Sequence, residues 1–366
     1  MSLRIEQIDK RFAASEALVK RFPTIKMYEL TQSEAKVYGL HHTGEDGIFS
    51  RMPVELADSI NPSISTLSRH TAGGRIRFRT DSPFVAIRAK RLNGFYMRHM
   101  TLSGSTGCDI IVGRGKDAYT IKMCAPIRVD DDWFEDGEKV MPKGEEFVKE
   151  MRDITVTLPL YGGLSEFYIG IDENSTLLAP EPYTHGKVAF YGSSVTQGGC
   201  ATRSGNSFDV IISRMMDCDV HNLGFSGSGK GEPEVAHYIA SLDLAAFVMD
   251  YDHNAPNPEH LEATHKPFFE IIRAAHPELP VIFMSRVRPE TSTREESNKR
   301  REIIKATYLD AVAKGDKNVY FIDGETVFPK DERDFCTVDG AHPNDLGFMY
   351  MAKAIMPYLR KVFGEE

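Results

Sequence analysis

The sequence predicts an α/β chain in which an all-β sandwich or jelly roll precedes a flavodoxin-like, doubly wound parallel sheet. Apolar residues of the first half recur at every second position, whereas those of the second half form short unbroken runs between amphipathic helical segments. Period two is typical of strands with one buried face, and runs apolar on both sides are typical of a parallel sheet covered by helices. The pattern changes after Pro180 and Pro182, which divides the 366 residues into two predicted domains, 1–182 and 183–366.

The first predicted domain begins with a charged, periodic segment, Met1 to Phe22, which we expect to form a short helical arm. Strands are expected between about residues 36 and 171, each with one buried face and one solvent-exposed face. Four alternating segments carry this expectation: Ile76/Phe78, Val85/Ile87/Ala89, Ile154/Val156/Leu158 and Phe167/Ile169/Ile171. Arginines flank the first of them. Gly and Pro between the segments favour a sandwich or jelly roll.

Composition excludes several classes of protein. A formal charge of -9 and a pI near 5.8 argue against nucleic-acid binding, which depends on clustered Lys and Arg. No stretch approaches the roughly 18 apolar residues of a membrane span, and the N-terminal segment lacks the pattern of a signal peptide. Five cysteines lie far apart without a C-x-x-C pair, which favours free thiols in a reducing compartment. We therefore expect a cytoplasmic protein without membrane partners.

The second predicted domain contains five apolar runs that we expect to form a parallel sheet. The runs span residues 188–191, 220–223, 244–249, 281–284 and 319–322. In doubly wound sheets the ligand binds at the carboxyl ends of the strands, so the loops that follow these runs are the candidates for a functional site.

The loop after the first run reads Gly-Ser-Ser-Val-Thr-Gln-Gly and contains Ser194. A serine on a tight strand-to-helix turn has an exposed hydroxyl, and its backbone N–H lies near a helix N-terminus that favours a developing negative charge. The motif is weak by itself, because turn or N-cap chemistry uses the same residues.

The loop after the second run is rich in glycine, and Gly227 lies within it. Glycines let backbone N–H groups approach a ligand closely. Gly224 to Lys230 also matches the G-x-x-x-x-G-K spacing of a phosphate loop, but Gly231 stands where such a loop needs Ser or Thr to hold magnesium. A flexible turn without a ligand is the other alternative.

The third run is followed by Asn254, whose side-chain amide can donate two hydrogen bonds without carrying charge. That property suits an oxyanion donor, although an asparagine here could instead form an Asn turn or cap the helix expected to begin near Pro258. Asp250, Asp252 and His253 lie beside it. They could suggest a metal, but without a second ligand cluster we interpret them as solvated loop charges.

The last run is followed by an Asp-x-x-His-Pro motif, Asp339, His342 and Pro343. A carboxylate three residues before a histidine can fix the imidazole tautomer, so that the other ring nitrogen faces a serine. We expect Pro343 to start the final helix, because its fixed φ suits the first helical position. Capping chemistry is the alternative for this motif.

In order and in position, these four loops resemble the four sequence blocks of the SGNH hydrolase superfamily, also called GDSL esterases. The resemblance spans about residues 187 to 363. It implies that Ser194 is the nucleophile, that Asp339 and His342 are its partners, and that the N–H groups of Ser194 and Gly227 form the oxyanion hole with the Asn254 amide.

The motif G-S-S-x-T-Q-G and the β-rich domain before it resemble those of one subgroup of this superfamily. Members of that subgroup remove acetyl or other short acyl groups from sugars. The resemblance implies a serine esterase for small-molecule or oligosaccharide esters that works through an acyl-enzyme, with no metal or organic cofactor. Ser193 replaces the usual Asp of the first block, and charged Asp252 and His253 precede Asn254. The second departure leaves open whether Asn254 or His253 completes the oxyanion hole.

Two alternatives remain at the level of the sequence. One is a lipase or thioesterase of the same mechanism, and the other is a non-catalytic carbohydrate-binding protein that keeps the fold, since a fold does not establish an activity.

Overall fold

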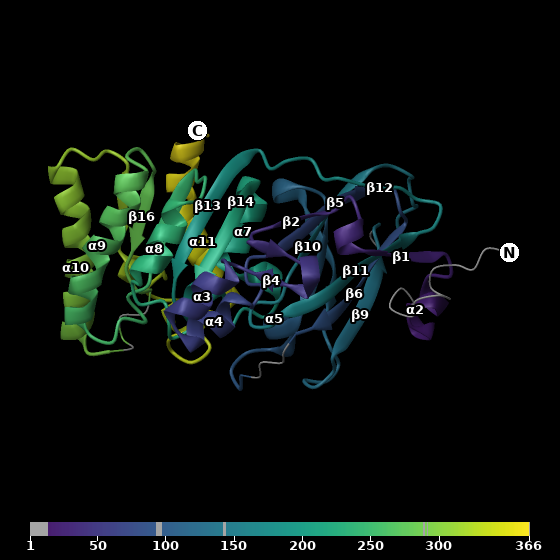
Figure 1. The fold of residues 1–366 in the computed structure, drawn as a ribbon, viewed down its shortest axis with the longest axis horizontal. Coiled ribbons are helices and arrows are strands. Elements are labelled where there is room, and N and C mark those ends of the chain that lie inside the picture. The colour runs from purple at the N-terminus through teal and green to yellow at the C-terminus, as the bar shows by residue number, and fades with distance from the viewer. Residues whose placement is uncertain (1–13, 93–96, 142–143, 288–289, 291, 366) are drawn as a thin grey trace.

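The computed structural model describes residues 14–92, 97–141, 144–287, 290 and 292–365. An N-terminal region of antiparallel strands and a C-terminal region of parallel strands and helices lie side by side along the long axis of the molecule (Figure 1). The predicted fold class, an α/β sheet preceded by a β sandwich, is confirmed.

Two antiparallel sheets face each other in the N-terminal region. The first has the order β1 (Ile25–Glu29), β11 (Leu164–Asp172), β6 (Phe84–Arg91), β9 (Trp133–Lys139). The second has the order β12 (Leu177–Leu178), β5 (Arg75–Thr80), β10 (Arg152–Thr157), β7 (Cys108–Val112), β8 (Tyr119–Cys124), and β2 (Lys36–Tyr38) also pairs with β5. A small pair, β3 (His42–Thr43) and β4 (Phe49–Ser50), and two short helices, α2 (Glu16–Arg21) and α5 (Leu102–Thr106), complete the region.

The apolar residues of all four alternating segments belong to one buried core between these two sheets. The prediction from period two is therefore confirmed for the inward-facing residues. The predicted helical arm is present as α2, while the part of that prediction on residues 1–13 lies outside the described residues.

The outward face of β5 differs from the expectation of a solvent-exposed face. Arg75 and Arg77 are 1% and 3% exposed. Arg75 forms an ion pair of 2.5 Å with Asp219 of the C-terminal region, and the Arg77 guanidinium lies 3.9 Å from the ring centre of Tyr183. This face is covered by the other region of the molecule, which the local pattern of β5 does not reveal.

The C-terminal sheet is parallel throughout. Its order is β14 (Cys218–Gly224), β13 (His185–Gly192), β15 (Ala246–Asp250), β16 (Val281–Met284), β17 (Val319–Ile322). In chain order this is 2-1-3-4-5, the flavodoxin-like arrangement. Each of the five apolar runs forms a strand, as predicted, although the third strand begins at Ala246, two residues after the start of its run.

Helices cover both faces of this sheet. The helices are α6 (Ser194–Gln197), α7 (Phe208–Met216), α8 (Pro233–Ala240), α9 (Pro258–Ala275), α10 (Arg294–Ala313) and α11 (Asp345–Phe363). Val188 and Phe190 of β13 pack in the core with α7 and α11, whereas Ala189 and Tyr191 pack in the core with α8, α9 and α10. No helix among the described residues is both long and apolar enough to cross a membrane.

The predicted start of the final helix at Pro343 is wrong by two residues. Asn344 is the N-cap of α11, and its side chain accepts hydrogen bonds from the backbone N–H groups of Leu346 and Gly347, both at 3.1 Å. Pro343 lies before the cap and pairs with Thr337 in an isolated β-bridge. A side chain that caps two orphan N–H groups therefore sets the boundary.

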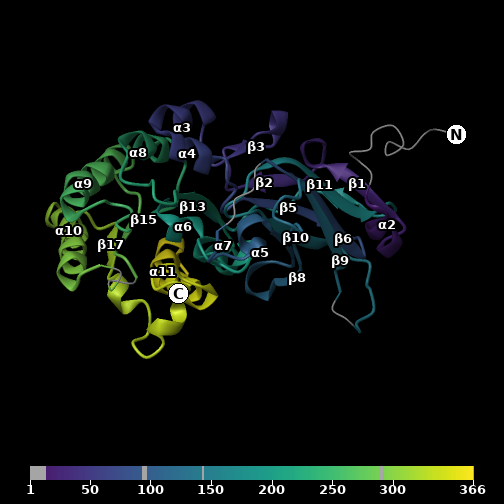
Figure 2. The ribbon, with the colours of Figure 1, turned by 90° about the horizontal axis from the view of Figure 1, so that it is seen from below.

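Two helices of the N-terminal half, α3 (Val54–Ile60) and α4 (Pro62–Ser68), lie beside α8 in both views (Figures 1 and 2). Ala57, Ile64 and Leu67 share a buried core with α8 and α9. The boundary that we propose, between residues 182 and 183, lies between β12 and β13. It divides the chain, but the interior of the C-terminal region is completed by residues from before it.

Candidate active site

Ser194 lies at the carboxyl end of β13, in the first position of α6. Ser193 caps this helix, because its Oγ accepts a hydrogen bond of 3.1 Å from the backbone N–H of Val195. The turn is so tight that a Cβ on Gly192 would lie 2.0 Å from Thr196 Oγ1 and 2.1 Å from the carbonyl oxygen of Asp250. The capping role thus falls to Ser193, and the hydroxyl of Ser194 remains available for other partners.

His342 and Asp339 reach Ser194 from the last loop. The Oγ of Ser194 lies 2.9 Å from Nε2 of His342, and Nδ1 of His342 lies 2.7 Å from Oδ2 of Asp339. The other carboxylate oxygen of Asp339 accepts hydrogen bonds from the backbone N–H groups of His342 at 2.8 Å and Ala341 at 3.0 Å. The structure therefore connects these three sequence-predicted residues by one chain of hydrogen bonds.

The electrostatics of this chain follow from its hydrogen bonds. Partial burial by itself would raise the pKa of Asp339, but the backbone and ring N–H groups of His342 and the backbone N–H of Ala341 lower it to about 2. The carboxylate is ionised at neutral pH and favours an imidazole with its proton on Nδ1. The lone pair of Nε2 then faces the hydroxyl of Ser194.

Gly227 lies on an exposed turn with a φ of +68°. Within the part of the chain that the structure describes, its backbone N–H has no acceptor. The turn is attached to the first loop, because the backbone N–H of Phe225 donates to the carbonyl oxygen of Gly192 at 2.9 Å. Asn254 joins from the third loop, since its Nδ2 donates to the carbonyl oxygen of Phe225 at 2.8 Å. One N–H of this amide remains, so the geometry suits a pair of donors at one edge of the sheet.

The alternative reading of Asn254 as a helix cap is wrong. Asn257 is the N-cap of α9, and its side chain accepts a hydrogen bond of 2.8 Å from the backbone N–H of His260. The amide of Asn254 instead contacts the turn that carries Gly227.

The interpretation of the neighbouring acids as solvated loop charges is also wrong. Asp250 and Asp252 are 3% and 1% exposed. Oδ2 of Asp252 accepts a hydrogen bond of 3.2 Å from the backbone N–H of Arg286, and its carbonyl oxygen accepts from the guanidinium of Arg300 at 2.8 Å. Burial lowers the pKa of His253 to about 4, so that its ring is uncharged at neutral pH. The charges that the sequence places before Asn254 are therefore neutralised or paired in the fold.

Gln197, the last polar residue of the Gly-Ser-Ser motif, connects three parts of the site. Its Oε1 accepts a hydrogen bond of 3.0 Å from the backbone N–H of Ser226, and its Nε2 donates to the carbonyl oxygen of Leu160 at 3.1 Å. The side chain is fully buried. Sequence reasoning quoted this residue within the motif but assigned it no role, because its partners lie 29 and 37 positions away in the chain.

Arg51 supports the second loop from the N-terminal half and was not found from the sequence. Its buried guanidinium donates to the carbonyl oxygens of Gly224 and Leu67, both at 2.6 Å, and of His70 at 2.9 Å. Burial lowers its pKa to about 9. No local pattern distinguishes such an arginine from an exposed one.

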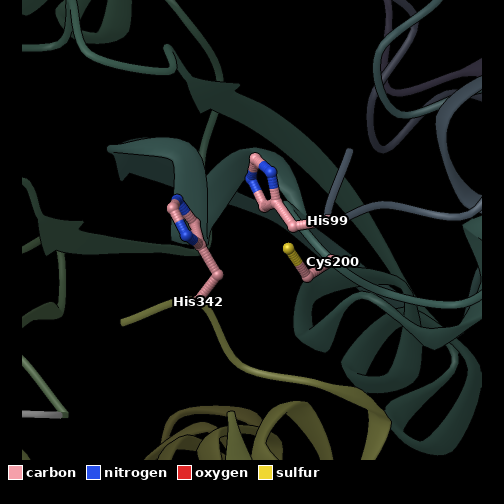
Figure 3. A group of neighbouring side chains, drawn as sticks. All are labelled: His99, Cys200 and His342. Carbon is pink, nitrogen blue, oxygen red and sulfur yellow. The ribbon is translucent and has the colours of Figure 1, made fainter. Parts of the chain in front are cut away.

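His99 and Cys200 lie beside His342 and were also missed (Figure 3). The rings of His99 and His342 have centroids 5.3 Å apart, and one ligand atom from each of the three residues lies within 4.8 Å of the others. Burial and the charge of Asp339 raise the pKa of the Cys200 thiol to about 12, so that it does not compete with Ser194 as a nucleophile. Cys200 lies 101 positions after His99 and 142 positions before His342, so spacing could not reveal this group.

Two family models match the chain. Residues 185–360 match the GDSL-like lipase/acylhydrolase family, and residues 25–177 match the N-terminus of SGNH-hydrolase-type esterases. No curated protein sequence matches the chain.

Solved structures share the fold over nearly the whole chain. A GDSL-like protein from Bacteroides ovatus has a TM-score of 0.81 at 26% identity and covers 93% of this chain and 99% of its own. The salicylyl-acyltransferase SsfX3 from a tetracycline biosynthetic pathway has a TM-score of 0.75 at 19% identity, covering 93% and 98%. The acetyl xylan esterase Est2A from the rumen bacterium Butyrivibrio proteoclasticus has a TM-score of 0.58 at 11% identity, covering 93% and 99%.

Proposed function

The chain belongs to the SGNH/GDSL hydrolase superfamily and is a serine ester hydrolase, and we propose that it removes short acyl groups, acetyl above all, from carbohydrates through an acyl-enzyme on Ser194. The observation that carries the catalytic part of the proposal is the hydrogen-bond chain from Ser194 through His342 to Asp339. It supplies a nucleophile, a general base and a group that orients the base.

In the first step, Oγ of Ser194 attacks the ester carbonyl while Nε2 of His342 accepts its proton. The ionised carboxylate of Asp339 stabilises the imidazolium that forms. The negative charge on the carbonyl oxygen is received by the N–H groups of Ser194, Gly227 and the Asn254 amide. His342 then protonates the leaving alcohol, and Ser194 retains the acyl group.

In the second step, His342 removes a proton from water, which attacks the acyl-enzyme, and His342 then returns the proton to Oγ of Ser194 as the acid is released. Every proton in this sequence moves between Ser194, His342, water and substrate. The proposed steps need no metal or organic cofactor.

Exposure at the site supports a carbohydrate ester over a long-chain lipid. The side chains of His342 and Asp339 are 24% and 34% exposed, so the reacting groups lie near the surface. A short acyl group on a bulky polar alcohol can reach such a site without entering a deep apolar tunnel. The similar acetyl xylan esterase Est2A is named for an ester of this class.

Transfer of the acyl group to another alcohol is the second candidate. It is favoured by the TM-score of the salicylyl-acyltransferase, which is higher than that of the acetyl xylan esterase. The acyl-enzyme is common to both reactions, and the two differ only in whether water or an alcohol resolves it.

A reducing compartment such as the cytoplasm is part of the proposal. All five cysteines are buried and none is bonded to another. Unpaired thiols are typical of reducing compartments.

The test is a panel of acetylated sugars compared with para-nitrophenyl esters of increasing chain length, with Ser194→Ala as the control. We expect acetate release from the sugars, a rate that falls with acyl length, and labelling of one serine by a fluorophosphonate probe. A rate that rises with chain length would support a lipase or thioesterase. Sugar binding without turnover or labelling would support a non-catalytic protein.

The same panel with an added alcohol acceptor separates hydrolysis from transfer. For a hydrolase, free acid remains the main product when the acceptor is present. A transferase would instead give the new ester as its main product.

A further inference from the structure

Three side chains with metal-binding atoms converge beside Ser194. His99 comes from the N-terminal region, Cys200 from the segment after α6, and His342 from the last loop (Figure 3). One ligand atom from each lies within 4.8 Å of the other two. This group contains two imidazoles and one thiol, and only His342 has a part in the proposed reaction.

We propose that His99, Cys200 and His342 bind Zn²⁺ or a similar thiophilic divalent cation, and that this binding switches the esterase off by occupying Nε2 of His342. Two nitrogen ligands and one sulfur ligand suit Zn²⁺ and disfavour Mg²⁺ or Ca²⁺, which prefer oxygen. Three protein ligands leave the fourth position to water, as is usual in open zinc sites. The effect on activity rests on the proposed function, whereas the binding does not.

Asp339 prepares His342 for this second role. Nδ1 of His342 is hydrogen-bonded to the carboxylate at 2.7 Å, so the lone pair of Nε2, which now lies 2.9 Å from Oγ of Ser194, is the one available to a cation. Carboxylate partners of this kind hold metal-binding histidines in one tautomer and raise their basicity. The arrangement that directs a lone pair at Ser194 therefore also presents it to a cation.

Cys200 is held in an unusual backbone conformation at this place. Its φ is +75°, in the left-handed region that glycine adopts freely and that is strained for other residues. The preceding residue, Gly199, packs against His342, because a Cβ there would lie 3.3 Å from Cδ2 of the imidazole. The strained backbone thus keeps a sulfur close to the ring that it would share with the metal.

Small movements are enough to form the site. Tetrahedral Zn²⁺ with bonds of about 2.0 Å to nitrogen and 2.3 Å to sulfur places its ligand atoms about 3.3 to 3.6 Å apart. The present separations of up to 4.8 Å must close by roughly 1 Å. His99 is exposed and can rotate toward the other two.

The proton balance of binding is simple. The cation takes the lone pairs of the two neutral imidazoles, and the thiol of Cys200 binds as a thiolate and releases one proton to solvent. No electron is transferred. Once Nε2 of His342 holds the cation, it cannot accept the proton of Ser194, and acylation stops.

The first experiment measures binding without activity. The full chain is treated with a chelator, desalted and titrated with Cd²⁺, whose thiolate complexes absorb in the ultraviolet. We expect a charge-transfer band in the wild type and in Ser194→Ala, and no band in Cys200→Ser. Cys124→Ala is the matched control, because Cys108 and Cys124 lie opposite each other on neighbouring strands, where two thiols could also hold the ion.

The second experiment measures inhibition by Zn²⁺ of the best ester substrate. We expect His99→Ala and Cys200→Ser each to raise the concentration for half inhibition at least about 100-fold, since losing even an outer-shell partner costs about 10- to 100-fold in affinity. His237→Ala, an exposed histidine on α8, should match the wild type. Because His99 is exposed, its variant should fold even where Cys200→Ser does not.

The outcomes separate the two proposals. A missing band in the wild type, a band that persists in Cys200→Ser, or a band lost only in Cys124→Ala would overturn the metal site. Unchanged inhibition in both ligand variants would overturn it as well. A band that requires Cys200, in a protein that turns over no ester, would leave the metal site standing and refute the proposed function.

Discussion

The first and last loops of the site hold their functional groups in opposite ways. The residues before and after Ser194 in its loop are buried. The contacts of this loop come from distant parts of the chain; for example, the Tyr161 hydroxyl donates to the Ser194 carbonyl oxygen at 3.2 Å. The loop of Asp339 and His342 is partly exposed, and its hydrogen bonds run mostly within itself. The nucleophile thus depends on tertiary structure, whereas the base and its partner are organised locally.

This contrast predicts where a substitution should act. Changes around Ser194 should affect both stability and rate, because that loop also joins the two regions of the molecule. Changes in the last loop should affect rate alone.

The largest effect is expected for the two groups that exchange the proton. Ser194→Ala and His342→Ala should each lower kcat by up to about a millionfold, because nucleophile and base act as one unit. The measurement is the hydrolysis of an activated acetyl ester, with the unfolding midpoint as the control for folding. Either variant keeping a tenth of the wild-type rate would be incompatible with the assignment.

Asp339→Asn should cost less, at most about ten-thousandfold in kcat, because this residue orients and stabilises the imidazole without touching substrate. Its side chain is 34% exposed, so water can replace part of its effect. Asp334→Asn, an exposed acid in the same loop, is the matched control and should retain full activity. Equal losses in the two variants would indicate a general disturbance of the loop.

Asn254→Ala should lower kcat by about a hundred- to a thousandfold with little change in KM, since an oxyanion donor acts in the transition state. Asn257→Ala is its counterpart, because Asn257 caps α9. That variant should lose about 1 kcal/mol of unfolding free energy and keep its kcat. The opposite distribution of effects would exclude Asn254 as a donor.

Gln197→Leu tests the tertiary part of the first loop. It leaves the N–H of Ser226 and the carbonyl oxygen of Leu160 without their present partner, and each buried unpaired group costs about 1–3 kcal/mol. We expect a lower urea midpoint together with a lower kcat, because the turn that carries Gly227 loses an anchor. Gln32→Leu, an exposed glutamine, should change neither. A variant with normal stability and reduced kcat would show that Gln197 acts on the reaction alone.

The smallest effect concerns His253 in acid. Its folded pKa of about 4 lies below the usual value of about 6.5, so the unfolded state binds the proton first as the pH falls. Stability contributed by the neutral ring is present above about pH 6.5 and is lost toward pH 4, by about 2 kcal/mol between pH 6.5 and 5. The measurement is the free energy of unfolding in urea at pH 6.5 and at pH 5. In His253→Asn the loss of stability between these two pH values should be smaller by about 2 kcal/mol than in the wild type, while kcat at pH 7 changes little. A large loss of kcat would instead make His253 the oxyanion donor.

The sequence by itself determined the strands and the loops that follow them. Periodicity depends on which face of an element is buried, so the four alternating segments and the five apolar runs were predicted correctly. The parallel topology then places the carboxyl ends of the strands at one edge, which is why residues from four distant loops could be assigned to one candidate site.

Only the tertiary structure decided what covers each surface and what holds each loop. Arg75 and Arg77 alternate like solvent-exposed residues, yet the C-terminal region buries them. Arg51 beneath the second loop, the partners of Gln197, and the approach of His99 and Cys200 to His342 likewise depend on contacts between segments far apart in the chain. Burial and electrostatics are properties of the assembled fold. The group that desolvates a side chain or pairs with it lies far away in the sequence, so the residues next to that side chain in the chain do not reveal it.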